Sequence, residues 1–285
     1  MIPKDMRNLN KYVLAGFLVL IGLACLYVRA FDSTRNVDVR HDRYRLVWME
    51  DFNGTGLDYS RWSKIKRAYQ APWLKYMSSD SSLYSVEKGR LRLYARENRN
   101  IDPNDTARIL TGGVSTENKV TVKYGKVEVK ARVKGAEGAW PAIWLLANDR
   151  RYRTYPIYAE IDFMEHYNQD DFVWQTVHNN YTDILGFKDK PKYQVKTPID
   201  SGKYNVYGVE ILPEMIVLSV NGKETMKYPN LHKDKEHQYP YGCEKYLMID
   251  MQVGNKWLKH VDLAHFPCYI DVDWVKVYVL AGSQR

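Results

Sequence analysis

Residues 126–134 read Lys-Val-Glu-Val-Lys-Ala-Arg-Val-Lys, so that charged and apolar side chains alternate along the whole stretch. Successive side chains of a β-strand point to opposite faces, and this alternation is typical of an antiparallel strand with one face in solvent. Residues 91–95 and 270–274 repeat the pattern, and Asn221-Gly222 after the apolar run 215–220 is a strong hairpin signal. No stretch after residue 30 keeps a helical period over several turns. The chain is therefore predicted to be all-β, and a sandwich of two antiparallel sheets is preferred over a closed barrel.

The first 30 of the 285 residues form a segment of their own. The basic residues Lys4, Arg7 and Lys11 precede an uncharged run over 12–28, and a small-residue cleavage pattern ends at Ala30. The segment is interpreted as a signal peptide or a membrane anchor. In either form it exports the protein to the periplasm, the medium or the cell surface, and membrane contact is expected only through it.

The rest of the chain is predicted to be a short polar tether over 31–42 and a single β-sandwich domain over 43–281, which we expect to be a monomer. The formal net charge is +8, but Lys and Arg alternate with acids instead of forming a stripe, so nucleic acid is not expected as a partner. Cys243 and Cys268 either form a disulfide in an oxidising compartment or stay as two reduced, buried thiols.

Three carboxylates fall within six residues of the segment Ala159-Glu160-Ile161-Asp162-Phe163-Met164-Glu165-His166. On a regular strand Glu160 and Asp162 share a face, and Glu165 points the other way. One extra residue at Phe163-Met164, a β-bulge, returns Glu165 to the face of the other two acids. The spacing therefore predicts a bulged strand.

A bulged strand lets the two long glutamate side chains approach to about 5 to 5.5 Å, the carboxyl separation that retaining glycosidases use. Three close carboxylates cannot all stay charged at ordinary cost, so one glutamate is expected to be ionised and the other protonated. A solvated strand face and a cation site are the alternatives. Calcium suits such a cation site better than zinc, because no pair of histidines stands at ligand spacing.

Aromatic residues and a histidine stand near the acidic segment in the sequence. Trp140 and Trp144 share parity, and they are either exposed indoles that stack on sugar rings or a pair of core tryptophans. On the next expected strand, over 172–178, alternation places Thr176 and His178 on one face, from which His178 reaches the acids. These neighbours favour catalysis over a merely acidic surface.

At this point the sequence resembles a known family, glycoside hydrolase family sixteen, whose signature is Glu-x-Asp-x-x-Glu on a bulged strand. Glu160, Asp162 and Glu165 match that signature. The similarity runs over nearly the whole chain after the export segment. Its matches stand in family order at 46–54, 112–114 with 124–131, 140–144, 160–165, 176–178, 207–210 and 272–278.

The resemblance implies a jelly roll of the concanavalin A type, whose concave face forms an open cleft for endo-cleavage of a β-linked polysaccharide or host glycan. The catalytic domain would be 43–281. Glu160 would be the nucleophile, Asp162 its modulating neighbour and Glu165 the acid/base of a retaining double displacement. His178 would assist near the reacting sugar, and Trp140 and Trp144 would line subsites.

The implied chemistry needs no cofactor, and a structural calcium ion is the metal that the resemblance suggests. The matching positions are Asp51, the carbonyl of Gly89 and Asp273. Carboxylate and carbonyl oxygens are the ligands that calcium prefers.

Several positions depart from glucan-cleaving family members where sugar hydroxyls would be bound. These positions are Ala159, Trp174-Gln175, Asp250 and Gly254-Asn255-Lys256-Trp257, and Gln175 and Trp257 are expected to contact substrate. The pattern looks closer to members that cleave internal β-galactosidic bonds in N-acetyllactosamine-type glycans such as mucin O-glycans. The alternatives are an endo-β-1,3- or mixed-linkage glucanase and a non-catalytic carbohydrate-binding jelly roll.

Overall fold

The computed structural model describes residues 43–281, apart from residues 70, 100, 103, 155, 156 and 259. The export segment 1–30 and the tether 31–42 lie outside the described residues and stay predictions. In the part of the chain that is described, no helix has the length and apolar character needed to cross a bilayer.

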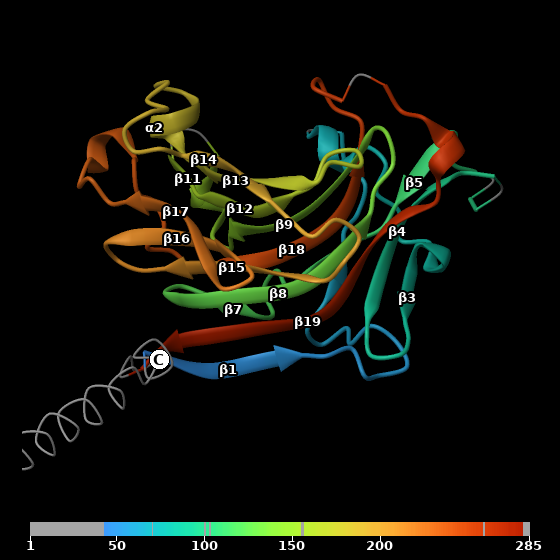
Figure 1. The fold of residues 1–285 in the computed structure, drawn as a ribbon, viewed down its shortest axis with the longest axis horizontal. Coiled ribbons are helices and arrows are strands. Elements are labelled where there is room, and N and C mark those ends of the chain that lie inside the picture. The colour runs from blue at the N-terminus through green and yellow to red at the C-terminus, as the bar shows by residue number, and fades with distance from the viewer. Residues whose placement is uncertain are drawn as a thin grey trace, which may run out of the picture. The chain divides into compact units, whose positions relative to one another are not determined.

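Two large antiparallel sheets form the domain (Figure 1). The first sheet has nine strands in the order β17-β16-β15-β8-β19-β4-β3, with β1 paired to β19 and β5 paired to β4. These strands are β1 (Tyr44–Glu50), β3 (Tyr84–Val86), β4 (Leu91–Glu97), β5 (Ile109–Thr111), β8 (Gly125–Lys134), β15 (Asn205–Ile211), β16 (Met215–Val220), β17 (Lys223–Pro229) and β19 (Cys268–Leu280).

The second sheet has eight strands in the order β14-β13-β12-β9-β18-β6-β2, with β7 paired to β18. They are β2 (Ser63–Lys64), β6 (Gly113–Ser115), β7 (Thr121–Val122), β9 (Ala139–Ala147), β12 (Glu160–Glu165), β13 (Phe172–His178), β14 (Gln194–Pro198) and β18 (Lys245–Val253). A small ribbon pairs β10 (Arg153–Thr154) with β11 (Ile157–Tyr158). The described helices are short: α2 (Asn180–Asp183) and the 3-10 turns η1 (Pro72–Leu74), η2 (Ser81–Leu83), η3 (Arg150–Tyr152), η4 (Asp234–Glu236) and η5 (Leu263–His265).

The stretch that predicted the fold is β8, in the middle of the first sheet between β15 and β19. Its apolar side chains at Val127, Val129 and Ala131 are buried, and the charged residues between them are partly exposed. The Asn221-Gly222 turn joins β16 to β17 with φ values of 52° and 75°, as a tight hairpin turn of this sequence requires. The predicted all-β sandwich is therefore confirmed.

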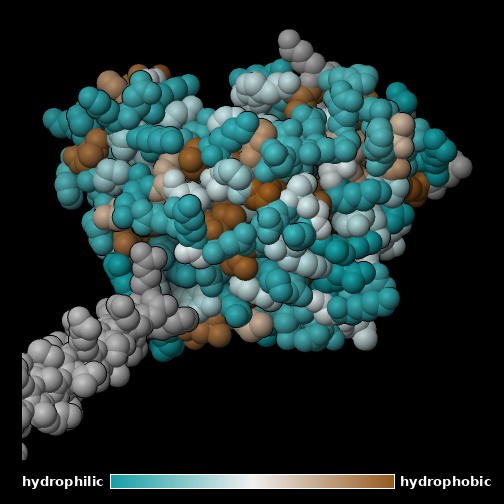
Figure 2. Space-filling model, viewed as in Figure 1, coloured by the Kyte–Doolittle hydropathy of each residue, from teal (hydrophilic) through white to brown (hydrophobic). Residues whose placement is uncertain are grey.

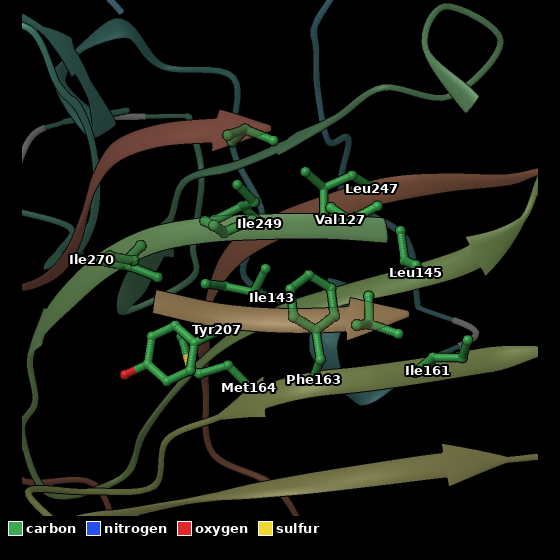
Figure 3. Packing of buried hydrophobic residues seen from close by; sticks show 14 of the residues in the cluster. Val127, Ile143, Leu145, Ile161, Phe163, Met164, Tyr207, Leu247, Ile249 and Ile270 are labelled. Atoms are coloured by element: carbon green, nitrogen blue, oxygen red, sulfur yellow. The ribbon is translucent and has the colours of Figure 1, made fainter. Parts of the chain in front are cut away.

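The hydrophobic core lies between the two sheets (Figure 3). Val127 and Tyr207 of the first sheet pack in one cluster with Ile143, Ile161 and Phe163 of the second. Each strand of the second sheet turns one of its two faces toward this cluster. The side chains at the alternating positions point to the other face of that sheet, which we call the outer face.

The outer face of the second sheet is flanked by raised segments, α2 on one side and the chain between β18 and β19 on the other (Figure 1), and Figure 2 shows a hollow between them. A second, smaller cluster covers part of this face. In it Ile65, Leu74 and Met77 pack on residues of β9 and β18, which are Ala142, Trp144, Tyr246 and Met248. The hollow is the place at which an outward-pointing side chain of β12 can meet a ligand.

The two cysteines considered for a disulfide are free, and both are buried. Of the two alternatives for Cys243 and Cys268, the structure therefore has the pair of reduced thiols.

Candidate active site

The acidic segment forms β12, and β12 carries the predicted bulge. Against β9, Asp162 pairs with Trp144 and Met164 pairs with Ile143, so Phe163 is an extra residue on β12. Both Phe163 and Met164 point into the core, as Figure 3 shows. Two successive inward side chains restore the outward direction at Glu165, and the predicted bulge is confirmed.

Gln175 on β13 is the polar residue that holds this bulge from behind. Its side chain is fully buried on the core side of the sheet, where Nε2 donates to the carbonyl oxygen of Phe163 at 3.0 Å. Its Oε1 accepts hydrogen bonds from the hydroxyls of Thr197, at 2.9 Å, and Thr225, at 2.7 Å. The prediction that Gln175 contacts substrate is therefore wrong, because the alternation that turns Thr176 outward turns Gln175 inward.

His178 and Asp162 meet on the outer face. The two residues stand on paired strands, and His178 Nε2 lies 3.0 Å from Asp162 Oδ2. Ligand atoms of Glu160, Asp162 and His178 all lie within 4.8 Å of one another. On its other side, His178 Nδ1 lies 3.0 Å from Oδ2 of Asp183, the last residue of α2. His178 therefore reaches the acids, as the alternation predicted.

Glu165 is 7% exposed, and its carboxyl group is held by two donors. The indole N–H of Trp140 donates to Oε1 at 2.8 Å, and the hydroxyl of Tyr167 donates to the same oxygen at 3.2 Å. Since Oε1 already accepts two hydrogen bonds, a proton on this carboxyl group belongs on Oε2. The arrangement thus leaves a single oxygen for proton transfer.

Burial and the negative charge of Asp162 raise the pKa of both Glu160 and Glu165 above the usual range of a glutamate. The neighbouring His178 lowers the pKa of both, and the hydrogen bonds from Trp140 and Tyr167 lower that of Glu165 further. The net direction is upward for each. A proton is therefore retained in this group of acids at higher pH than ordinary glutamates allow, which is what general acid catalysis near neutral pH requires.

The two tryptophans of β9 differ in their environments. Trp140 is partly exposed beside Glu165, whereas Trp144 is only 4% exposed. Trp144 donates its indole N–H to Asp250 at 3.0 Å, and Trp73 of η1 packs edge-on against it at 4.9 Å between ring centroids. The prediction that Trp144 lines a subsite is therefore wrong, because Trp73 covers it. The alternative of a core tryptophan holds for Trp144.

Trp257 is 64% exposed and lies in the segment between β18 and β19 that flanks the outer face. Its backbone N–H is fixed by the side chain of Asn255 at 2.8 Å. An exposed indole at a cleft rim suits stacking on a sugar ring. The substrate contact of Trp257 stays a prediction.

The expected calcium site brings Asp51 and Gly89 close together. A Cβ placed on Gly89 would lie 3.9 Å from the carbonyl oxygen of Asp51 and 3.0 Å from the side-chain oxygen of Asn53, so oxygens gather there. Asp273, however, forms an ion pair with Lys130 at 2.8 Å. The calcium site of Asp51, Gly89 and Asp273 stays a prediction.

The group Glu160, Asp162 and His178 also has the composition of a cation site. Both ring nitrogens of His178 point at carboxylate oxygens, which accept hydrogen bonds and do not donate them when ionised. A histidine arranged in this way has no lone pair to give to a metal. The geometry therefore disfavours the cation-site alternative.

Sequence patterns missed four residues of the site, which are Trp73, Tyr158, Tyr167 and Asp183. Tyr158 donates its hydroxyl to Asp183 Oδ2 at 2.8 Å. Asp183 follows His178 by only five residues, yet no alternation signals their contact, because the chain turns through α2 between them. Tyr167 follows Glu165 by two residues, and that closeness is the one signal that could have indicated it.

The chain is similar to known proteins over most of its length. Residues 74–276 match a protein-family model described as "Glycosyl hydrolases family 16". A keratan-sulfate endo-1,4-beta-galactosidase from Sphingobacterium multivorum is 32% identical over 240 residues, which are 83% of this chain and 56% of that protein. A glucan endo-1,3-beta-glucosidase A1 from Niallia circulans is 28% identical over 256 residues, which are 82% of this chain and 37% of that protein.

The solved laminarinase from Rhodothermus marinus superimposes with a TM-score of 0.72 and 25% sequence identity, over 84% of this chain and 98% of that one. The chain spans about half the length of the galactosidase and about a third of the Niallia glucosidase. The shared region is therefore the β-sandwich domain with its acidic strand.

Proposed function

Because the chain belongs to glycosyl hydrolase family 16, we propose that it is a retaining endo-β-glycosidase that cleaves internal β-galactosidic bonds of N-acetyllactosamine-type glycans such as mucin O-glycans. The observation that carries the reaction class is the bulge in β12, which puts Glu160, Asp162 and Glu165 together on the outer face of the second sheet. A solvated acidic strand would not need two hydrogen-bond donors aimed at one glutamate oxygen.

In the first step of the proposed reaction, an ionised oxygen of Glu160 attacks the anomeric carbon of the bound sugar. The bond from that carbon to the leaving sugar's oxygen breaks, and the proton on Glu165 Oε2 passes to this oxygen. Trp140 and Tyr167 fix the orientation of the donor by holding Oε1. The product of the step is a glycosyl ester on Glu160 and a released sugar chain.

In the second step, Glu165 is ionised and takes a proton from water. The water oxygen attacks the anomeric carbon, and the carboxylate of Glu160 leaves. Two inversions at one carbon give net retention. His178 lies beside Glu160 and balances the negative charge that Glu160 gains when it leaves.

The galactosidic preference rests on the relative that cleaves a β-1,4-galactosidic bond, to which the chain is 32% identical. The departures at Trp174 and Asp250 from glucan-cleaving members also support it. Gln175 is not a substrate contact. It stabilises the bulge and does not indicate which sugar is bound.

A second candidate is an endo-β-1,3- or mixed-linkage glucanase. It is favoured by the glucan-cleaving relative at 28% identity and by the laminarinase whose fold superimposes on this domain. The two candidates share the catalytic groups and differ only in the sugar that lies across them.

A glycan panel tests the proposal. The purified chain is incubated with keratan-type poly-N-acetyllactosamine, mucin O-glycans, laminarin and mixed-linkage glucan, and the products are measured by mass. The proposal expects internal cleavage of the first two with galactose at the new reducing ends. Products from the glucans alone would establish the second candidate. Binding without cleavage of any glycan, unchanged in E160Q, would indicate a carbohydrate-binding module.

We also propose that the domain acts outside the cytoplasm, because residues 1–30 have the composition of an export segment. Cell fractionation and N-terminal sequencing of the mature protein test this. Recovery of the full-length chain from the soluble cytoplasm would contradict it.

A further inference from the structure

His178 is held between two carboxylates that come from different elements. Its Nε2 lies 3.0 Å from Asp162 of β12, and its Nδ1 lies 3.0 Å from Asp183 of α2. An ionised carboxylate only accepts hydrogen bonds, so each ring nitrogen must carry a hydrogen to satisfy its partner. A neutral imidazole carries one such hydrogen. The geometry therefore requires the doubly protonated, positively charged imidazolium.

Asp183 is placed for this contact by local structure. The side chain of Asn179 accepts from the backbone N–H of Thr182, and the hydroxyl of Thr182 accepts from the backbone N–H of Asn179. This capping box fixes the single turn of α2. Tyr158 then donates its hydroxyl to Asp183 Oδ2 at 2.8 Å, which is the same oxygen that faces His178.

The titratable groups around His178 are almost all acids. Glu160, Asp162 and Glu165 come from β12 and Asp183 from α2, while the phenol of Tyr158 stacks near the imidazole ring. The hydroxyl of Tyr241 bonds the backbone carbonyl of His178. In the part of the chain that the structure describes, His178 is the cation beside these four carboxyl groups. Its charge therefore decides how many of those acids can be ionised together.

We propose that Asp183 is a positioning residue of the active site, which acts through His178 by holding it as an imidazolium beside Glu160. The proposal rests on the proposed function in one respect, because the charge of His178 affects the reaction only if Glu160 is a nucleophile that must be ionised. Asp183 itself does not touch substrate or the reacting atoms. Its effect on the reaction passes through the ring.

The direction of the electrostatic effects agrees with this role. Burial lowers the pKa of His178, but the hydrogen bonds with Asp162 and Asp183 outweigh burial and raise it well above its usual value. His178 in turn lowers the pKa of Glu160 and Glu165 against the raising effect of burial. Removing the charge of Asp183 therefore lowers the pKa of His178, and wherever the ring is then neutral it no longer lowers the pKa of Glu165.

The direct test is the protonation state of His178 in the chain labelled with 15N-histidine. The chain has seven histidines, and H178Q assigns the signal of interest. In the wild type we expect an imidazolium at about pH 7, and in D183N a ring that loses its proton about one to two pH units lower. A neutral His178 in the wild type, or an imidazolium of unchanged pKa in D183N, would overturn the proposal.

The kinetic test uses the pH profile of kcat/KM on whichever glycan the wild type cleaves. We expect the alkaline limb of the bell in D183N to move to higher pH by about one unit, because a neutral His178 no longer lowers the pKa of Glu165. Y158F keeps the carboxylate and should move the profile much less. A uniform loss in D183N at every pH would point to a structural role only and would contradict the proposal.

Two controls separate the possible failures. D149N removes a partly exposed carboxylate that pairs with Arg151, and it should alter neither the His178 signal nor the pH profile. Equal thermal melting of D183N and wild type at one pH shows that the fold is kept. Because the NMR measurement needs no substrate, it tests Asp183 even if the proposed glycosidase activity is not found.

Discussion

Gln175 donates a hydrogen bond to the carbonyl oxygen of Phe163 across 3.0 Å, at the one place where β12 leaves regular pairing with β9. A bulge interrupts the ladder hydrogen bonds, and a buried carbonyl left without a partner costs about 1 to 3 kcal/mol. Gln175 satisfies that carbonyl from the core side. The residue that stabilises the direction of Glu165 thus lies behind the sheet, out of reach of any sugar.

Replacing Gln175 by Met keeps the side chain's length and removes all its hydrogen bonds. We expect Q175M to lower the free energy of unfolding by about 1 to 3 kcal/mol and to lower kcat by about tenfold or more, because Glu165 loses its fixed direction. Chemical denaturation and steady-state kinetics measure the two effects. T197V removes only one partner of Gln175 and serves as control. A destabilised Q175M with wild-type kcat would show that the bulge does not depend on Gln175.

The two glutamates should respond differently to substitution. E165Q is expected to lose about 10²–10⁴-fold in kcat on natural glycans and much less on an activated aryl glycoside, whose leaving group needs no proton. E160Q should lose activity on both substrates, because no glycosyl ester can form. E87Q, at an exposed position, is the matched control. An E160Q variant with full turnover would remove Glu160 from the mechanism.

Burial raises the pKa of Glu165, and Trp140 opposes that effect by donating its indole N–H to Oε1 at 2.8 Å. A donor to a carboxylate lowers its pKa, so W140F should raise the pKa of Glu165 and move the alkaline limb of kcat/KM to higher pH. Y167F should act in the same direction but less, since its contact is longer at 3.2 Å. Movement of that limb to lower pH would contradict the assignment of Glu165 as the acid.

Asp250 makes the stability depend on pH. Burial raises its pKa from 3.8 to about 7, against the lowering effect of hydrogen bonds from Trp144 and Gln252. A carboxyl group with a raised folded-state pKa stabilises the fold fully below its unfolded pKa, and that stability is lost as the pH rises through about 7. D250N should therefore gain stability over the wild type as the pH rises from about 4 to about 8, by up to roughly 4 kcal/mol.

Thermal melting at several pH values measures this difference between D250N and the wild type. Equal Tm differences at low and high pH would show that Asp250 is ionised at ordinary pH in the folded protein.

Local sequence patterns predicted the strands in which side chains alternate regularly between the two faces of a sheet. Alternation at 126–134 gave β8, and counting along 160–165 gave the bulge, because both follow from which face each side chain must occupy. The same counting places Gln175 in the core. The prediction that it binds sugar relied on a family position instead of on its parity, and it failed there.

Contacts between distant segments had no such signal. Trp144 is buried because η1 folds over it, and nothing in the sequence around Trp73 indicates which strand it will cover. Asp183 meets His178 only because α2 turns the chain back, and the ion pair of Lys130 with Asp273 crosses between β8 and β19. These contacts depend on the assembled sheets, so the charge state of the site could not be worked out from the acidic segment alone.

The central claim is that Glu160 and Glu165 act as nucleophile and acid/base on one face of a bulged strand. Proton NMR of the newly formed reducing end, recorded in the first minutes of cleavage of a β-linked glycan, tests it most directly. Two displacements at one carbon give the β-anomer first, and the α-anomer then grows by mutarotation. Appearance of the α-anomer first would mean a single displacement by water and would contradict the claim.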